Sequence, residues 1–311
     1  MNVLAFRMAY GFVRAISFLP LDVLYLMAVP LRFLAINVLG YRRKVVVDNL
    51  RRAFPGKSET DIQHIAGDFY RYFSELMVET IKVMDFSEAS LAERIRFKNP
   101  EIIDQYFAEG KSVVAIAAHY GNWEWLQGLT GSIPHKPIAV YKPLNNGDMD
   151  RVLTQQRSRF GAELVSMRDI IRTLRRYHRE KQPTLSMYIS DQSPVWEEIQ
   201  YWMPFLNQST PVYLGPEKIA REFGMAVVYL RMHVVRRGYY EVEIIPVTGD
   251  ARREKDHVVT NRHVNLLEKT IMEKPEYWLW SHRRWKLTRK RELQEKQGIY
   301  KFDGPFLRKQ N

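Results

Sequence analysis

The pattern of hydrophobic and polar positions changes character near residue 93. Before it, in residues 58–84 for example, apolar side chains recur at helical spacing. After it, short apolar runs such as 112–118 and 184–189 have the length and β-branched content of buried strands, and they alternate with helical stretches. This order predicts an α/β fold, with a mostly parallel central sheet flanked by helices and an N-terminal helical membrane-associated segment.

Residues 1–41 are the most apolar stretch of the chain. Charges and prolines interrupt it, so no charge-free run reaches the roughly 18–20 residues of a simple membrane span. We predict a membrane-embedded or interfacial helical segment that is kinked at Pro20 and Pro30. The alternative is a helix of a soluble protein in which the apolar residues are irregularly spaced.

The remaining boundaries follow from charge and from helix signals. Arg42, Arg43 and Lys44 come directly after the apolar segment, and such a basic cluster marks the cytoplasmic face of a membrane. Residues 42–92 are predicted to be a helical subdomain, residues 93–286 the α/β domain, and residues 287–311 a basic C-terminal tail. Within the α/β domain, Thr210 and Pro211 are predicted to begin a helix that runs to Phe223.

Composition narrows the classes of partner. The chain has 311 residues, a formal net charge of +12 and a pI near 9.7, which favours polyanionic partners. It lacks helix-turn-helix, zinc-finger and RNA-recognition patterns, so we expect an anionic membrane and no nucleic acid. It also has no cysteine, which excludes a disulfide framework and a thiol nucleophile.

The stretch His119-Tyr120-Gly121-Asn122-Trp123-Glu124-Trp125 carries the clearest candidate chemistry. His119 directly follows a predicted strand, Gly121 permits a tight turn, and Asn122 suits the N-cap of a helix beginning at Trp123. In one continuous helix, His119 and Glu124 would point apart. A strand–turn–helix arrangement can instead fold Glu124 back toward His119, at the carboxyl end of a strand, where open α/β sheets bind ligands.

This pair of residue types suits acyl transfer to a hydroxyl group. A neutral imidazole can take the proton of an attacking alcohol, and a carboxylate on the other ring nitrogen fixes the tautomer and stabilises the imidazolium. We therefore predict that His119 is the general base and that Glu124 orients it. The alternative is a strand-end histidine followed by a glutamate that begins an ordinary surface helix.

Further polar residues follow other predicted strands. Lys142 comes after one strand and could bind an anion, or it is a solvated surface lysine. Asp191 and Gln192 come after another strand, and Asp191 could equally be a turn-forming residue. Because parallel strands end at one edge of a sheet, we expect Asp191 to lie near His119 and to support the site without transferring the proton.

A second distinctive phrase, residues 275–286, mixes tryptophans with Arg283, Arg284 and Lys286. Such a mixture suits a membrane interface or an anionic lipid headgroup. The alternative is a tryptophan-rich corner of the core with solvated arginines.

These phrases together resemble a known family. A His-x4-Asp/Glu motif after a buried strand is similar to the glycerolipid and lipid A acyltransferases. Residues 119–125 most resemble the late (lauroyl/myristoyl) acyltransferases of bacterial lipid A biosynthesis. The Asp191-Gln192 pair, the phrase Arg159-Phe160-Gly161 and the closing phrase of residues 275–286 are also similar to that family.

Two departures from the family pattern are present. Lys142 stands where the family has the arginine of a Tyr-Arg-Pro phrase, and lysine keeps the charge but loses bidentate anion recognition. The glycine-rich region expected after the Asp-Gln pair is replaced by residues 194–198, Pro-Val-Trp-Glu-Glu.

The resemblance implies an enzyme at the cytoplasmic face of the cell inner membrane. It implies acyl carrier protein as the acyl donor and a hydroxyl of a lipid A precursor as the acceptor, with neither cofactor nor metal. It implies catalytic roles for His119 and Glu124 and substrate binding by Lys142, Arg159, Asp191 and Gln192. Alternatives are another glycolipid or lysophospholipid acceptor, a thioesterase, or a non-catalytic peripheral membrane module.

Overall fold

The computed structural model describes residues 3–143, 147–296, 300–302 and 307–309. Within these residues, seven strands form one sheet in the order β1-β9-β8-β2-β5-β3-β4. Neighbouring strands are parallel except for the antiparallel pair β8 and β9, which confirms the predicted mostly parallel sheet. The strands are β1 (Ile95–Lys98), β2 (Val113–Ala117), β3 (Lys136–Tyr141), β4 (Glu163–Ser166), β5 (Thr184–Ile189), β8 (Ala226–Arg236) and β9 (Tyr239–Thr248).

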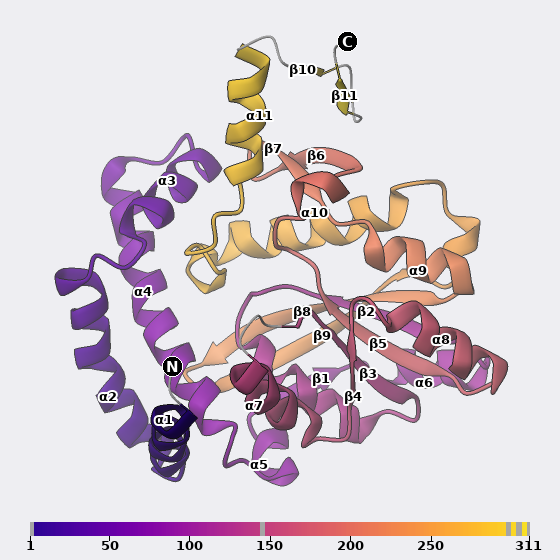
Figure 1. Cartoon of the computed structure of the whole chain (residues 1–311), viewed down its shortest axis with the longest axis horizontal. Helices are drawn as coiled ribbons and strands as arrows, with labels where there is room; N and C mark the ends of the chain where they lie inside the picture. The colour runs from indigo at the N-terminus through magenta and orange to yellow at the C-terminus, as the bar shows by residue number, and fades with distance from the viewer. Residues whose placement is uncertain (1–2, 144–146, 297–299, 303–306, 310–311) are drawn as a thin grey trace.

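Helices cover the sheet, with α9 and α10 above it in the view of Figure 1. The central strand β2 is buried along its whole length, because a parallel strand covered on both faces has no solvated side. The helices of this domain and of the C-terminal region are α5 (Glu88–Ala92), α6 (Glu101–Ala108), α7 (Gly147–Ser158), α8 (Ile170–Arg179), α9 (Gly215–Phe223), α10 (Val258–Glu273) and α11 (Lys286–Lys296).

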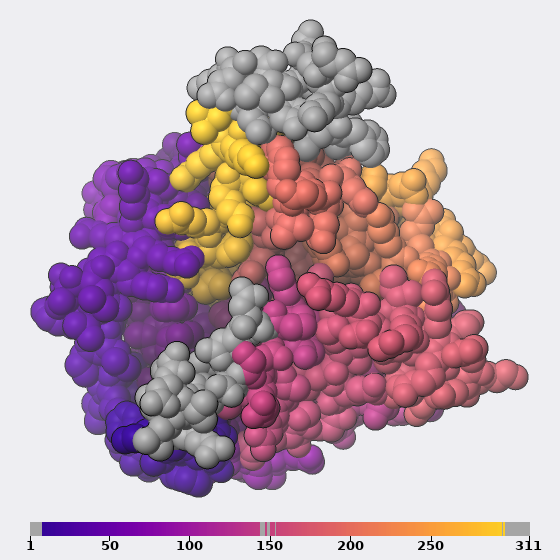
Figure 2. Space-filling view, in the orientation of Figure 1, coloured from indigo at the N-terminus to yellow at the C-terminus, as the bar shows by residue number. Residues whose placement is uncertain are grey.

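The N-terminal helices stand at one side of the sheet (Figures 1 and 2). They are α1 (Val3–Ser17), α2 (Leu21–Phe33), α3 (Arg43–Ala53) and α4 (Glu59–Lys82). Ser58 and Asp61 form a capping box at the start of α4. Helix α2 continues through a π-helical turn at Leu34–Val38.

The apolar N-terminal segment leaves much of its surface uncovered. Residues Leu21–Val38 form a helix long and apolar enough to cross a membrane, with a mean hydropathy of 1.7, and only 22% of this window is buried inside the protein. Leu26, Phe33 and Leu39 are among its exposed apolar side chains. The segment is therefore a candidate membrane segment, as the sequence predicted.

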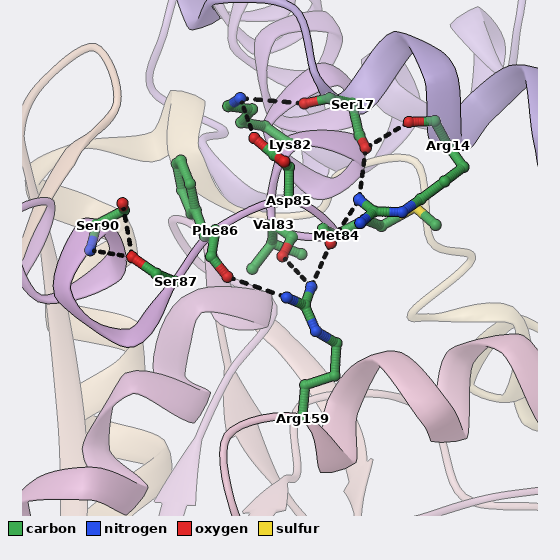
Figure 3. Close-up of polar contacts among 10 residues, drawn as sticks. All are labelled: Arg14, Ser17, Lys82, Val83, Met84, Asp85, Phe86, Ser87, Ser90 and Arg159. Carbon is green, nitrogen blue, oxygen red and sulfur yellow. Dashed lines mark hydrogen bonds and ion pairs between the residues drawn. The ribbon is translucent and has the colours of Figure 1, made fainter.

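The C-terminal end of α4 joins three parts of the chain (Figure 3). The carbonyl oxygen of Met84 accepts hydrogen bonds from Arg14 of α1, at 2.8 Å, and from Arg159, which follows α7. Lys82 donates to the carbonyl oxygen of Ser17 and pairs with Asp85. Cations thus satisfy carbonyl groups at this helix end, where the helix dipole favours positive charge.

One predicted helix start is wrong, and another is confirmed. Thr210 and Pro211 lie in strand β7 (Gln208–Val212), which pairs with β6 (Tyr201–Phe205) as a separate hairpin, and α9 begins only at Gly215. The Thr210 hydroxyl accepts a hydrogen bond from the Trp285 indole instead of capping a helix. A helix begins at Trp123 as predicted, but it is a 3₁₀ helix (Trp123–Ser132), and the Asn122 side chain makes no cap hydrogen bond. The last strands are β10 (Tyr300–Phe302) and β11 (Leu307–Lys309).

Candidate active site

His119 and Asp191 meet at the carboxyl ends of two neighbouring strands. Ala117 of β2 pairs with Ile189 of β5 in parallel register, so each site residue lies two positions beyond a matched pair. The Asp191 Oδ1 atom is 2.6 Å from His119 Nδ1, and Asp191 Oδ2 accepts the His119 backbone N–H at 3.1 Å. The expected proximity of Asp191 to His119 is confirmed, and the carboxylate on the imidazole is that of Asp191.

The turn that carries His119 has little freedom. Gly121 has φ +62°, and a Cβ atom there would lie 2.4 Å from the sulfur of Met232. The backbone of the closing phrase pairs with the turn, because Gly121 N–H donates to Tyr277 O and Leu279 N–H donates to His119 O. These constraints fix the direction of the imidazole before any substrate binds.

Asp191 is held as a charged group in the interior. Burial by itself raises the pKa of this carboxyl, but the charge and hydrogen bonds of His119 and the Trp278 N–H outweigh burial and lower the pKa to about 2. The indole Nε1 of Trp278 lies 2.8 Å from Asp191 Oδ2. An ionised Asp191 selects the imidazole tautomer with hydrogen on Nδ1, which leaves the lone pair of Nε2 free to accept a proton.

The Gln192 amide lies beside His119 Nε2. Its nitrogen is 3.2 Å from this ring nitrogen, which can accept the amide N–H in the tautomer with hydrogen on Nδ1. Both residues border the same cavity. A substrate hydroxyl that replaces the Gln192 amide would present its proton to His119.

Glu124 has another partner than the one predicted. Its carboxylate forms a two-point ion pair with Arg157 of α7, with N–O distances of 2.5 and 3.0 Å, and also accepts the Trp123 indole N–H at 3.2 Å. The Trp123 ring packs edge-on against the His119 ring, with 4.9 Å between centroids. Glu124 therefore lies near His119, but its carboxylate is oriented by Arg157.

A cavity of about 360 Å³ begins at His119 and extends along strands β5, β3 and β4. His119, Glu124, Arg157, Gln192 and Lys142 border it. The wall is otherwise mostly apolar and includes Leu129, Ile138, Ala139, Leu164, Leu185 and Met187. Polar groups at one part of a long apolar pocket suit a ligand with a reactive polar group and a hydrocarbon chain.

The two remaining predicted substrate contacts are placed differently from each other. Lys142 is exposed and lines the cavity. The Arg159 guanidinium donates hydrogen bonds to carbonyl oxygens of the chain after α4, among them those of Val83 and Phe86 at 3.2 Å each (Figure 3). Among the described residues, no cluster of three or more histidine, aspartate or glutamate side chains could hold a metal ion.

The tryptophan-rich phrase forms part of the core. Trp278, Trp280 and Trp285 are buried, and the buried guanidinium of Arg284 donates to the carbonyl oxygen of Pro211. Burial lowers the pKa of Arg284 to about 10. Of the two interpretations of this phrase, the structure therefore favours the core corner, although Arg284 is itself buried and not solvated.

Glu79 of α4 is a buried polar residue that the sequence pattern did not single out. Its carboxylate accepts hydrogen bonds from Tyr25 Oη and Tyr240 Oη at 2.6 Å each and from Asn122 Nδ2 at 2.7 Å. Asn122 belongs to the turn after His119, so Glu79 connects this turn to α2. The available signal was its position three residues after Leu76, on the apolar face of the predicted helix.

Comparisons with known proteins agree over most of the chain. A family model described as bacterial lipid A biosynthesis acyltransferase matches residues 3–287. The lipid A biosynthesis palmitoleoyltransferase of Escherichia coli K12 is 22% identical over 273 residues, with 86% of each chain covered. The lauroyltransferase of that organism is 22% identical over 271 residues, covering 86% of this chain and 87% of the relative. A lipid A biosynthesis acyltransferase of Haemophilus influenzae is 23% identical over 238 residues, covering 75% and 72%.

Proposed function

Because the chain belongs to the bacterial lipid A biosynthesis acyltransferase family, we propose that it transfers a fatty acyl chain from an acyl carrier protein thioester to a hydroxyl of a lipid A precursor. The observation that carries the chemistry is the His119–Asp191 pair at the head of the apolar cavity.

In the proposed mechanism, His119 is the general base. Its Nε2 atom removes the proton of the acceptor hydroxyl while the oxygen attacks the thioester carbonyl. Asp191 holds the hydrogen on Nδ1 and stabilises the imidazolium. The tetrahedral intermediate then collapses, and the imidazolium gives its proton to the leaving thiolate. Such proton transfer contributes roughly 10²–10⁴ in rate.

The oxyanion of the intermediate needs donors beside the base. Gln192 is the nearest candidate, because its amide already points at His119 Nε2. Lys142 lies on the same cavity and brings a positive charge. We propose these two residues as substrate contacts that favour the developing negative charge.

We propose that Glu124 and Arg157 act together at the cavity wall. The two-point pair holds Arg157 in one orientation, and Arg157 can then bind a polar group of either substrate. Glu124 contributes to catalysis in this proposal by placing Arg157 and Trp123 around the imidazole. Arg159, whose guanidinium binds carbonyl oxygens, is proposed to anchor α7 to the end of α4.

The apolar wall is proposed to hold the acyl chain. Ala139 of β3 borders the cavity, so Ala139→Phe would fill part of it. The variant should prefer a shorter acyl chain than the wild type. Competition between acyl carrier protein thioesters of two lengths, read by mass spectrometry of the product, would measure the shift.

One reaction, in which two possible products are quantified, tests the proposed function. Purified enzyme is mixed with an acyl carrier protein thioester and a lipid A precursor, and both lipid and free fatty acid are quantified. The proposal expects acylated lipid in wild type and none with His119→Ala. Free fatty acid alone would show a thioesterase, and neither product with any acyl donor would favour a non-catalytic membrane protein.

A comparison of cells with and without this chain tests the proposed acceptor. Lipid A from cells with and without this chain should differ by the mass of one acyl group. An unchanged lipid A together with a changed glycolipid or lysophospholipid would move the acceptor to those classes. Membrane association at the cytoplasmic face of the inner membrane, which the exposed apolar face of α2 supports, is part of the same proposal.

A further inference from the structure

A second cavity, of about 590 Å³, lies at the start of the candidate membrane segment and shares no lining residue with the cavity at His119. It is bounded by the start of α2, the end of α4 and the turn between β8 and β9. Four cations border it, Lys82, Arg94, Arg236 and Arg237, against one carboxylate, Asp22. The cavity therefore presents an excess of positive charge.

Two of these cations are neutralised within the protein and two are not. Lys82 pairs with Asp85, and Arg237 pairs with Glu75. Arg94 and Arg236 form no ion pair with any carboxylate in the described part of the chain. Two guanidinium groups that form no ion pair favour an anionic ligand.

The Tyr239 ring contacts both Arg94 and Arg236, and Arg94 also donates to the carbonyl oxygen of Gly238. Their guanidinium carbons lie 4.9 and 3.7 Å from the centroid of the Tyr239 ring. The ring restricts both side chains, which are otherwise long and flexible, and so lowers the entropy that binding an anion would cost. Two guanidinium groups held beside the same cavity suit a phosphate group in particular, because their planar donors match its oxygens.

The wall of the cavity is rigid. Gly238, in the turn between β8 and β9, has φ +67°, and a Cβ atom there would lie 2.5 Å from Tyr25 Oη and 3.3 Å from Leu21. Tyr25 Oη in turn donates to the buried Glu79. The turn is therefore seated directly on α2, and the cavity keeps its shape through buried contacts.

Exposed apolar side chains adjoin the cationic cavity. Phe18 and Leu19 precede the lining residue Pro20, and Val235 precedes Arg236; their exposed fractions are 60%, 36% and 64%. The exposed apolar face of α2 continues from there. A small soluble anion would use only the cations, whereas a phospholipid has a phosphate for the cavity and acyl chains for the apolar surface.

We propose that this cavity binds the phosphate headgroup of an anionic glycerophospholipid of the membrane, with Arg94 and Arg236 on the phosphate. The site is separate from the acyl-transfer site and goes beyond the proposed function. It would seat the start of α2 at a defined depth in the membrane surface.

The test measures thermal unfolding of the full-length protein in a neutral detergent. The added probes are a short-chain phosphatidylglycerol, the phosphatidylcholine of equal chain length, and inorganic phosphate. Phosphatidylglycerol should raise the unfolding midpoint by about 3 °C or more near saturation. The zwitterionic lipid and inorganic phosphate should raise it much less.

Variants locate the effect. The double variant Arg94→Gln/Arg236→Gln should lose the response to phosphatidylglycerol. The control Arg172→Gln/Arg253→Gln removes the same charge from two exposed arginines, 83% and 87% exposed, and should keep the response. If the first double variant does not fold, the single variant Arg236→Gln is used, because that side chain is exposed.

Three outcomes would overturn the proposal. Equal shifts with both lipids would mean that apolar contacts alone explain binding. An equal shift with inorganic phosphate would mean an anion site without lipid recognition. A full response in the Arg94 and Arg236 variants would place the phosphatidylglycerol elsewhere. Native mass spectrometry of the lipid adducts provides a second readout in each case.

Discussion

Asp191 and Glu79 are buried carboxyl groups whose pKa values are shifted in opposite directions. Asp191, beyond strand β5, and Glu79, within α4, each accept three hydrogen bonds. Yet the pKa of Asp191 is lowered to about 2, while burial raises the pKa of Glu79. The difference lies in the donors, because Asp191 faces an imidazole that can become positive and Glu79 faces two hydroxyls and an amide.

The geometry of the donors separates the two sites further. Asp191 accepts from N–H groups of the His119 backbone, the His119 ring and the Trp278 indole, and the backbone and indole groups cannot act as acceptors. At Glu79, two of the three donors are tyrosine hydroxyls, which can rotate and accept. The donors around Asp191 thus require a carboxylate, whereas those around Glu79 require only a hydrogen-bonding group of the same size.

Exchanging each carboxyl for an amide should give the largest contrast. In Asp191→Asn, the amide NH₂ must face either a fixed N–H group or the His119 ring. Facing the ring favours the tautomer with hydrogen on Nε2, which cannot act as base. Transfer should fall by about 10²–10⁴, close to the loss in His119→Ala.

The matched change Glu79→Gln should keep transfer within about threefold of wild type, since it lies outside the reacting atoms and its hydroxyl partners can reorient. Initial transfer rates of folded proteins, with folding checked by circular dichroism, measure both changes. Equal losses in the two amide variants would remove the distinction between the two carboxylates.

Truncation of the Glu79 side chain should lower the stability of the protein more than the change to an amide does. Glu79→Ala leaves three buried donors without an acceptor and should lower the free energy of unfolding by about 3 kcal/mol or more. Glu79→Gln should cost about 1 kcal/mol. Thermal or denaturant unfolding in detergent gives both values. If Ala and Gln variants were equally stable, Glu79 would not hold the junction of α2, α4 and the His119 turn.

Much of this comparison could be anticipated from local signals. The run 112–118 and its glycine turn indicated a strand end at His119, and parallel strand order placed Asp191 beside it. The partner of Glu124 could not be found in this way, because Arg157 lies 33 positions away on a helix that also carries Arg151. Its choice depends on the packing of α7, which no spacing encodes.

Other failures of sequence interpretation have similar causes. Thr210 and Pro211 have the local chemistry of a helix start, but pairing of β7 with β6 and the contact with Trp285 outweigh it. The tryptophans and cations of residues 275–286 suit a membrane surface as well as a core, and only the fold shows Arg284 buried. Local propensity is overridden wherever long-range contacts decide the environment.

The Glu124–Arg157 pair should have an intermediate effect. Glu124→Ala and Arg157→Ala should each lower transfer by about 10–10²-fold, and the double variant should be hardly worse than either, because paired residues act as a unit. The exposed pair Arg175 and Glu222 provides the control, and its removal should leave the rate unchanged. Multiplicative losses would mean that Glu124 and Arg157 serve separate steps.

The pH dependence of stability should show the smallest effect. Below its ordinary pKa of 4.5, the Glu79 carboxyl is protonated in both the folded and the unfolded chain. As pH rises, this carboxyl ionises first in the unfolded chain, because its pKa is raised in the folded protein. Wild type should therefore lose stability relative to Glu79→Gln as pH increases from about 4.5 toward neutrality. The pair with Asp191 acts in the other direction, since its contribution is lost as pH falls from about 4 through 2.

Unfolding midpoints of wild type and Glu79→Gln at several pH values from the ordinary pKa of 4.5 up to neutrality would show the first effect. A difference that stays constant over this range would contradict the raised pKa of Glu79.

If Asp191 acts through His119, the losses caused by changing the two residues should not multiply, and a double-mutant cycle on initial transfer rate measures this. In the wild-type background, Asp191→Asn should reduce transfer by about 10²–10⁴. In the His119→Ala background, where no imidazole remains to orient, the same change should reduce it by less than about threefold. An equal reduction in both backgrounds would contradict the account, because Asp191 would then act on the substrate independently of His119.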